Sequence, residues 1–232
     1  MDRTNKKAVF FILIIILVGV AAVVCSRIYT MLTAFHYEEH LDEEIVTVDD
    51  VSVTLREFGY YIYTVEAYIQ EQALLYNSDN PNQWWNTHFS AGLDSAFVCD
   101  YAKESAVSTC VCYEIYYQEA VRSGLSLDAA QEDEAAAQAN EMLGKMNDYQ
   151  RAATGLNEEM ILEVRKKQLL ASNYITSLAQ TTDFAGYLGE PHKLLNWNGE
   201  YYTEKILPNH TVLENYEILD HITFGKITVN YE

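Results

Sequence analysis

The chain has 232 residues and a formal net charge of −19, with 15 basic residues against 34 acidic ones. A surface of this sign is repelled by nucleic acid, so the composition excludes a nucleic-acid-binding role. Hydrophobic residues make up 49% of the chain and only three residues are proline, which is typical of a folded and largely helical protein.

A basic tail over residues 1–7 precedes an uncharged apolar stretch over residues 8–26, AVFFILIIILVGVAAVVCS. As a helix rising about 1.5 Å per residue, such a stretch is long enough to cross the hydrocarbon core of a bilayer. Cations on its N-terminal side place the tail in the cytoplasm by the positive-inside rule. The sequence therefore predicts a single-pass transmembrane signal-anchor in the cell membrane, with the bulk of the chain outside the cytoplasm.

Two alternatives for this segment stay open. A cleavable signal peptide has a shorter apolar region and a small-residue exit, which this stretch lacks. A lipid-modified cysteine is the second alternative, at Cys25, although Val24 stands where lipoprotein signals carry a small residue.

Residues 27–44 become steadily more acidic, which predicts a stalk that continues the first helix outward. Within it, HYEEH matches the H-x-x-E-H pattern of inverted zinc peptidases. On a helix, His36 and His40 would share a face and could hold zinc, with Glu39 polarising a water molecule. The competing interpretation is a solvated acidic helix face, so these histidines are weak metal candidates and no cofactor is expected.

The helical domain is predicted over residues 45–232. It begins with IVTVDDVSVT over residues 45–54, a pair of short β-branched runs typical of a hairpin. Thr54 and Glu57 then have the spacing of a capping box, which predicts the start of a helix. This helix ends before the turn-rich segment 77–83.

Three more helices follow from apolar residues at spacings of three and four and from their capping residues. They are predicted over about residues 95–124, 126–155 and 157–182. The closing segment, residues 216–232, is β-branched and partly alternating, and it predicts one or two strands that pair with the early hairpin. The expected fold is mainly α, with about four helices and a small β element.

The four cysteines do not have the spacing of disulfide partners. Cys99 and Cys110 lie about 16 Å apart along one predicted helix, and Cys110 and Cys112 point to different faces. A Cys-x-Cys metal or redox site is the alternative to small buried apolar residues.

The order of these parts resembles the N-terminal chaperone domain of the SurA and PrsA family of extracytoplasmic foldases. The resemblance rests on a strand pair that ends in VSVTLREFGYYI, on YQEAVRSGLSLDAAQED at the end of the second helix, and on GLNEEMILEVRKKQLL at the start of the fourth. It covers about Ile45 to Leu178. It implies a chaperone that binds unfolded or newly exported polypeptides.

The sequence departs from the isomerase members of that family. Asp220, His221 and Ile222 are similar to the start of a parvulin domain, but the chain printed here ends at Glu232. Prolyl isomerase activity is therefore not expected.

Exposed aromatic side chains would suit a chaperone, because they stack on many sequences without requiring one. The client-binding candidates lie off the apolar stripes or in the loop after the first helix: Tyr60, Tyr63, Trp84, Trp85, Phe89 and Tyr116. The alternative is that these rings fill the core. A structural or adaptor role with one specific envelope partner also stays open.

Overall fold

The computed structural model describes residues 18–20, 22–26, 35–89 and 95–229, and it divides into two compact units, Met1–His36 and Tyr37–Glu232. In the first unit, residues 18–20 and 22–26 are helical. Across the described parts of the chain, no helix has both the length and the apolar character needed to cross a membrane. This finding corrects the transmembrane helix predicted over residues 8–26, of which residues 8–17 and 21 lie outside the described residues, as does the tail over residues 1–7.

The segment predicted as a helical stalk is not a continuous helix where it is described. Residues 35 and 36 are not helical, and a short 3-10 turn, η1, covers Tyr37–Glu39. Tyr37 and Leu41 are buried, and the Arg56 N–H donates to the Leu41 carbonyl at 2.7 Å. Burial of these two apolar side chains holds the turn against the start of the next helix, so it does not extend as a solvated stalk.

A three-stranded antiparallel sheet in the order β2-β1-β3 is formed by β1 (Glu44–Val48), β2 (Val51–Thr54) and β3 (Val212–Glu214). The predicted hairpin is therefore present, and Asp49 in its turn has a positive φ of 53°. The predicted strands in residues 216–232 are wrong for the described residues. There α9 covers Tyr216–Leu219, and turns and bends follow.

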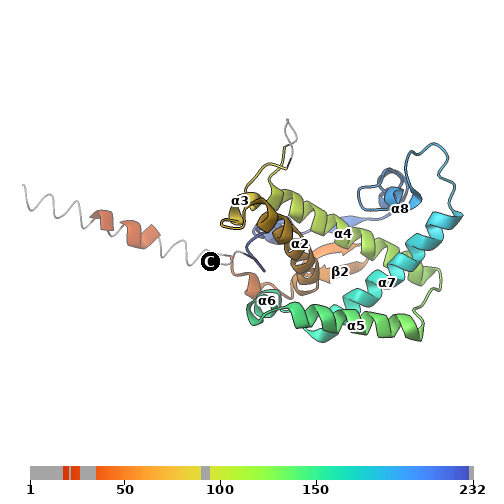
Figure 1. Cartoon of the computed structure of the whole chain (residues 1–232), viewed down its shortest axis with the longest axis horizontal. Helices are drawn as coiled ribbons and strands as arrows, with labels where there is room; N and C mark the ends of the chain where they lie inside the picture. The colour runs from red at the N-terminus through yellow and green to blue at the C-terminus, as the bar shows by residue number, and fades with distance from the viewer. Residues whose placement is uncertain (1–17, 21, 27–34, 90–94, 230–232) are drawn as a thin grey trace, which may run out of the picture. The chain divides into compact units, whose positions relative to one another are not determined.

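The mainly helical character is confirmed, with four long helices in the second unit (Figure 1). They are α2 (Leu55–Tyr76), α4 (Val98–Arg122), α5 (Ala129–Lys145) and α7 (Glu158–Thr181). Caps explain two of the starts, because Thr54 accepts from Glu57 N–H at 3.2 Å and Asn157 accepts from Met160 N–H at 2.9 Å. Both side chains satisfy amide groups that the first helical turn leaves unpaired.

The third predicted helix is split in two. Its cap is Asp128 and not Ser126, and after α5 a second, short helix α6 covers Asp148–Thr154. Asn147 causes the split, because its side chain accepts from Gln150 N–H in a capping box and so starts a new helix. α6 ends at Gly155, where the sequence predicts the end of the third helix, and Gly155 adopts the left-handed conformation with φ 67°.

The core lies where α4 packs against α7 on one side and against β1 and α2 on the other, and α5 covers α7. Shorter elements complete the unit: α3 (Asn82–Trp85), α8 (Pro191–Leu194), η2 (Tyr202–Ile206) and η3 (Leu207–Asn209). In the view of Figure 1, α3 lies beside the C-terminal half of α2, and α8 lies beyond the other side of α4. The loops around α3 and α8 thus flank the surface between α2 and α4.

The cysteines of the described residues form no disulfide, and Cys25 is exposed. Cys110 and Cys112 are buried in α4, while Cys99 is half-buried. Burial raises the pKa of the Cys112 thiol to about 12. A thiol held protonated in this way is a poor nucleophile and a poor metal ligand, which argues against the Cys-x-Cys site.

Candidate functional site

A groove with a volume of about 770 Å³ runs between α2 and α4. The other cavities described below have volumes of about 220 to 250 Å³. One wall is formed by residues of α2: Thr64, Val65, Tyr68, Ile69 and Gln72. The opposite wall is formed by Val98, Tyr101 and Ser105 of α4, and the ends by Trp84, Phe89 and the loop residues Asn196, Trp197 and Asn198. Residues of α2, of α3 and the loop after it, of α4 and of the distant loop after α8 therefore build one concave surface.

Five aromatic rings line this surface, and two of them are exposed. Tyr68 is 66% exposed and Phe89 is 57% exposed. The Phe89 ring stacks on Tyr101 with centroids 4.5 Å apart, and Trp84 lies 4.9 Å from Tyr76. Because neighbouring rings hold Phe89 and Trp84, these apolar faces are arranged before any ligand arrives.

The polar lining residues of the groove are uncharged. They are the amides of Gln72, Asn196 and Asn198 and the hydroxyl groups of Thr64 and Ser105. Amides and hydroxyls both donate and accept hydrogen bonds, as a peptide backbone does. The groove therefore combines apolar ring faces with groups that can pair with a neutral main chain.

Trp85, the residue next to Trp84, holds this end of the groove in place. Trp85 is buried, and its Nε1–H donates to Gln70 Oε1 at 2.9 Å. Gly225 has a φ of +87° and lies so close to the indole that a Cβ there would meet the ring at 2.6 Å. Only glycine allows this approach, and it connects the C-terminal segment to α3.

That C-terminal segment is itself bound by Glu66, a fully buried residue of α2. The carboxylate accepts from the backbone N–H groups of residues 225–228 and from the Thr228 hydroxyl, at 2.5 to 3.3 Å. Burial raises the pKa of Glu66, and the hydrogen bonds from Thr228 and Gly225 oppose the shift. Five donors around one carboxylate hold the segment against α2 and behind Trp85.

The candidate residues predicted from sequence separate into two groups. Trp84 and Phe89 line the groove. Tyr60, Trp85 and Tyr116 are buried and do not line it. Tyr63 is half-buried in α2 and also lies outside the lining.

The two buried tyrosines are held by hydrogen bonds inside the helical core. The Tyr60 hydroxyl donates to Gln168 Oε1 at 3.0 Å and accepts from Arg165 Nη1 at 2.8 Å. The Tyr116 hydroxyl donates to the Leu195 carbonyl at 2.7 Å. Both tyrosines lie off the apolar stripes of their helices, which predicts that they are exposed. However, α2 and α4 are covered on more than one side, so one apolar stripe underestimates the buried surface of each helix.

Sequence reasoning missed Trp197, Tyr101 and Tyr68 as groove residues. Trp197 lies in an irregular loop after α8, where no periodicity shows which side is exposed. An aromatic residue between two asparagines in a loop could have indicated Trp197. The candidate Trp84 was predicted from the same kind of pattern, an aromatic residue in a loop. Tyr101 needed knowledge of how α4 faces α2.

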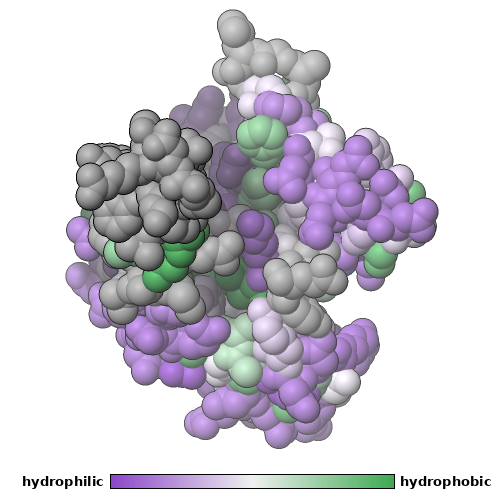
Figure 2. Space-filling view, turned by 90° about the vertical axis from the view of Figure 1, so that its left-hand side faces the viewer, coloured by the Kyte–Doolittle hydropathy of each residue, from purple (hydrophilic) through white to green (hydrophobic). Residues whose placement is uncertain are grey.

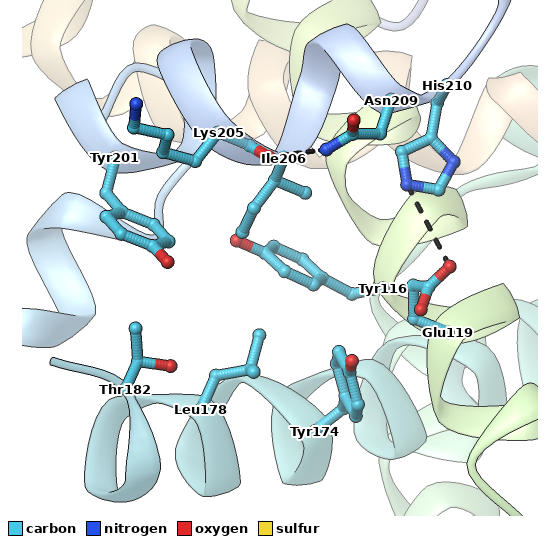
Figure 3. A pocket seen from close by; sticks show the side chains of 10 residues that line it. All are labelled: Tyr116, Glu119, Tyr174, Leu178, Thr182, Tyr201, Lys205, Ile206, Asn209 and His210. Carbon is cyan, nitrogen blue, oxygen red and sulfur yellow. Dashed lines mark hydrogen bonds and ion pairs between the residues drawn. The ribbon is translucent and has the colours of Figure 1, made fainter.

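A second cavity, of about 220 Å³, lies between α7 and the η2–η3 segment (Figure 3). Tyr174, Leu178 and Thr182 lie along one side, and His210 lies near Glu119 at 4.0 Å on the other. His210 Nδ1 also lies 2.9 Å from Asp49 Oδ2. The hydrogen bond with His210, with a further one from Thr211 N–H, lowers the pKa of Asp49 to about 2.

This Asp49–His210 pair closes the β1–β2 turn onto the end of η3. The Thr211 N–H donates to Asp49 Oδ1 at 2.9 Å, and Arg122 Nη2 donates to Oδ2 at 3.2 Å. Both Asp49 oxygens are therefore engaged in holding the hairpin to neighbouring segments. We interpret the pair as a structural connection.

The histidines proposed as zinc ligands do not share a helical face in the described structure. His36 belongs to the first unit and His40 to the second, where its Nδ1 lies 2.7 Å from Glu43 Oε1. Over the described residues, no group of three or more His, Cys, Asp or Glu side chains is placed to hold a metal ion.

Hydrophilic residues cover much of the face of the molecule shown in Figure 2, and hydrophobic residues gather in patches between them.

The comparisons with known proteins add no further guide to the site. No family model, curated protein or solved structure matches the chain.

Proposed function

We propose that the second unit is a chaperone-like module that binds unfolded polypeptides in the groove between α2 and α4. The observation that carries the proposal is the lining of that groove, which joins exposed aromatic rings to uncharged amide and hydroxyl groups. Its volume lies within the range of roughly 300 to 1,000 Å³ that is typical of ligand clefts.

The chemistry of the lining favours segments of many sequences over one sequence. Tyrosine and tryptophan rings bring large contact areas at low conformational cost, and they accept aliphatic or aromatic partners. Amide side chains pair with the main chain, which is the same in every polypeptide. A ligand therefore needs an extended backbone and some apolar side chains, and both are available in an unfolded chain.

Charge narrows the class of clients further. The chain has a net charge of −19, while the groove lining has no charged residue. The surrounding field attracts basic clients and repels acidic ones, and the neutral groove does not require a charge at the contact itself. We expect neutral and basic unfolded segments to bind best.

The double variant Tyr68→Ala with Trp84→Ala is expected to weaken binding of a fluorescein-labelled, unstructured apolar peptide at least about tenfold, because it removes the exposed Tyr68 ring and the half-buried Trp84 ring from the groove. Fluorescence anisotropy measures this change. Suppression of light scattering by an unfolded model protein should fall in parallel.

The matched control for that experiment is Tyr149→Ala. Tyr149 is 44% exposed on α6 and does not line the groove. Equal peptide affinity in the double variant and the control, with unchanged circular dichroism, would overturn the proposal. Binding of one peptide among many, with no effect on aggregation, would instead favour an adaptor with a dedicated partner.

A further inference from the structure

Strand β3 is an edge strand with one side turned away from the sheet. In the order β2-β1-β3 it pairs only with β1. The Asp49 N–H donates to the Thr211 carbonyl at 2.8 Å, and the Asn215 N–H donates to the Ile45 carbonyl at 2.9 Å. Because antiparallel pairing alternates, Leu213 also faces β1, and the backbone groups of Val212 and Glu214 point outward.

A cavity of about 250 Å³ lies beside this outward edge. Val212 and Glu214 line it from β3, and Ser108 and Val111 line it from α4. In the sheet register, Val212 is opposite Val48 and Glu214 is opposite Val46, and both valines are buried. The cavity therefore lies on the same side of the sheet as the buried valines, beside β3, where a fourth strand would lie.

Trp197 joins this edge to the groove. The same half-buried residue lines both the groove between α2 and α4 and the cavity beside β3. A chain that lies in the groove can thus pass the indole and reach the edge of the sheet.

We propose that an extended segment of a bound polypeptide adds to β3 as a fourth strand and continues past Trp197 into the groove. This inference rests on the proposed function and names how its ligand is held. Unpaired edge groups supply hydrogen bonds that any sequence can make, and pockets for alternate side chains supply preference.

The cavity also defines the side chains that the added strand should carry. Side chains at alternate positions of a strand point to one face. One of them would lie beside Val212 and Val111, which favours an apolar group, and the next beside Glu214, which favours a basic one. The ligand is therefore an extended segment with an apolar and a basic residue two positions apart.

The substitution Val212→Pro tests this proposal. Proline removes the N–H at position 212, which points away from β1, so the ladder between β1 and β3 keeps its hydrogen bonds. The probe is a ten-residue fluorescein-labelled peptide in which Val and Lys alternate at every second position, with Ser between them, so that both lie on one face of the strand. We expect its affinity by fluorescence anisotropy to fall about tenfold.

The control is Ser52→Pro on the opposite edge strand. Ser52 is paired with Thr47, and the same alternation places its N–H away from β1. The affinity of this variant for the peptide should match the wild type. An equal loss in both variants would contradict a specific role of β3.

A second experiment keeps the test valid if Val212→Pro fails to fold. Peptides N-methylated at every second residue, in either of two phases, are titrated into the wild-type protein. Strand addition predicts that one phase binds at least about tenfold more weakly than the other, since only alternate N–H groups face β3.

The outcomes separate this inference from the proposed function. Equal binding of both methylated phases, with loss of binding in Tyr68→Ala and Trp84→Ala, overturns strand addition and leaves the groove as the site. Absence of peptide binding to the wild type overturns both.

Discussion

Replacement of Glu66 by alanine is expected to lower the free energy of unfolding by about 3 kcal/mol or more. The carboxylate accepts hydrogen bonds from the N–H groups of residues 225–228 and from the Thr228 hydroxyl, and the residue is fully buried. Alanine leaves these donors without their acceptor and leaves a cavity in the core. Each buried unpaired donor costs about 1 to 3 kcal/mol, although such costs are not additive.

Urea unfolding followed by circular dichroism measures this effect. Glu71→Ala is the matched control, because Glu71 lies on the same helix and is exposed, and it should change stability by less than about 0.5 kcal/mol. Glu66→Gln should fall between the two, since it keeps one acceptor oxygen. A stability of Glu66→Ala equal to that of the control would contradict the role of Glu66 in holding the C-terminal segment.

The second large effect is expected at Lys167. Its Nζ lies 2.8 Å from Glu57 Oε1 and 3.3 Å from Glu114 Oε2, between α2, α4 and α7. The Glu114 side chain is only 3% exposed. Lys167→Met leaves two carboxylates together without a cation, and we expect a loss of about 3 to 5 kcal/mol, as for other broken buried ion pairs.

The pH dependence of this contribution follows from the direction of the pKa shift. Burial lowers the pKa of Lys167, but the carboxylates of Glu114 and Glu57 outweigh that effect and raise it. A raised lysine pKa gives stability that is fully present below the unfolded value of about 10.4 and is lost as pH rises above it. The difference between wild type and Lys167→Met should therefore stay constant from pH 7 to 9 and shrink above pH 10.

Two further variants check the explanation for Lys167. Lys166→Met makes the same substitution one residue earlier and should cost less than about 1 kcal/mol. Adding Glu114→Gln to Lys167→Met should recover part of the stability, because one stranded charge is removed. If the double variant is less stable than Lys167→Met, the ion-pair explanation is wrong.

Local signals predicted the helices well and the distant contacts poorly. Apolar spacing and the caps at Thr54 and Asn157 place α2 and α7 within a few residues of their observed bounds. The Ala-rich third helix was predicted as continuous, because its spacing persists across Asn147, where a local capping box wins. A capping side chain can start a new helix at a single residue. The spacing of apolar residues continues across such a residue and does not reveal the break.

The C-terminal segment shows how a contact distant in the sequence overrides a local preference. Its β-branched residues favour a strand, but Glu66 binds the N–H groups of residues 225–228. Groups bound to one carboxylate cannot also form a ladder, so the third strand comes from Val212–Glu214 instead.

The groove was only half predictable for a related reason. Trp84 and Phe89 were found because aromatic residues in a loop stand out in the sequence. Tyr101 and Trp197 join them only when α4 and the loop after α8 come together in the fold. One stripe of apolar residues does not predict which side of a helix is exposed when several of its faces are packed. Tyr116 lies off the stripe of α4 and is nevertheless buried.

Site-specific photocrosslinking tests the central claim most directly, with p-benzoylphenylalanine placed at position 68, 197 or 149 of the full chain. Labelled unfolded peptides of several unrelated sequences are added and irradiated. Binding in the groove predicts crosslinks from positions 68 and 197 to most of these peptides, and few from position 149. Crosslinks of equal yield at all three positions, or none at 68 and 197, would contradict polypeptide binding in the groove.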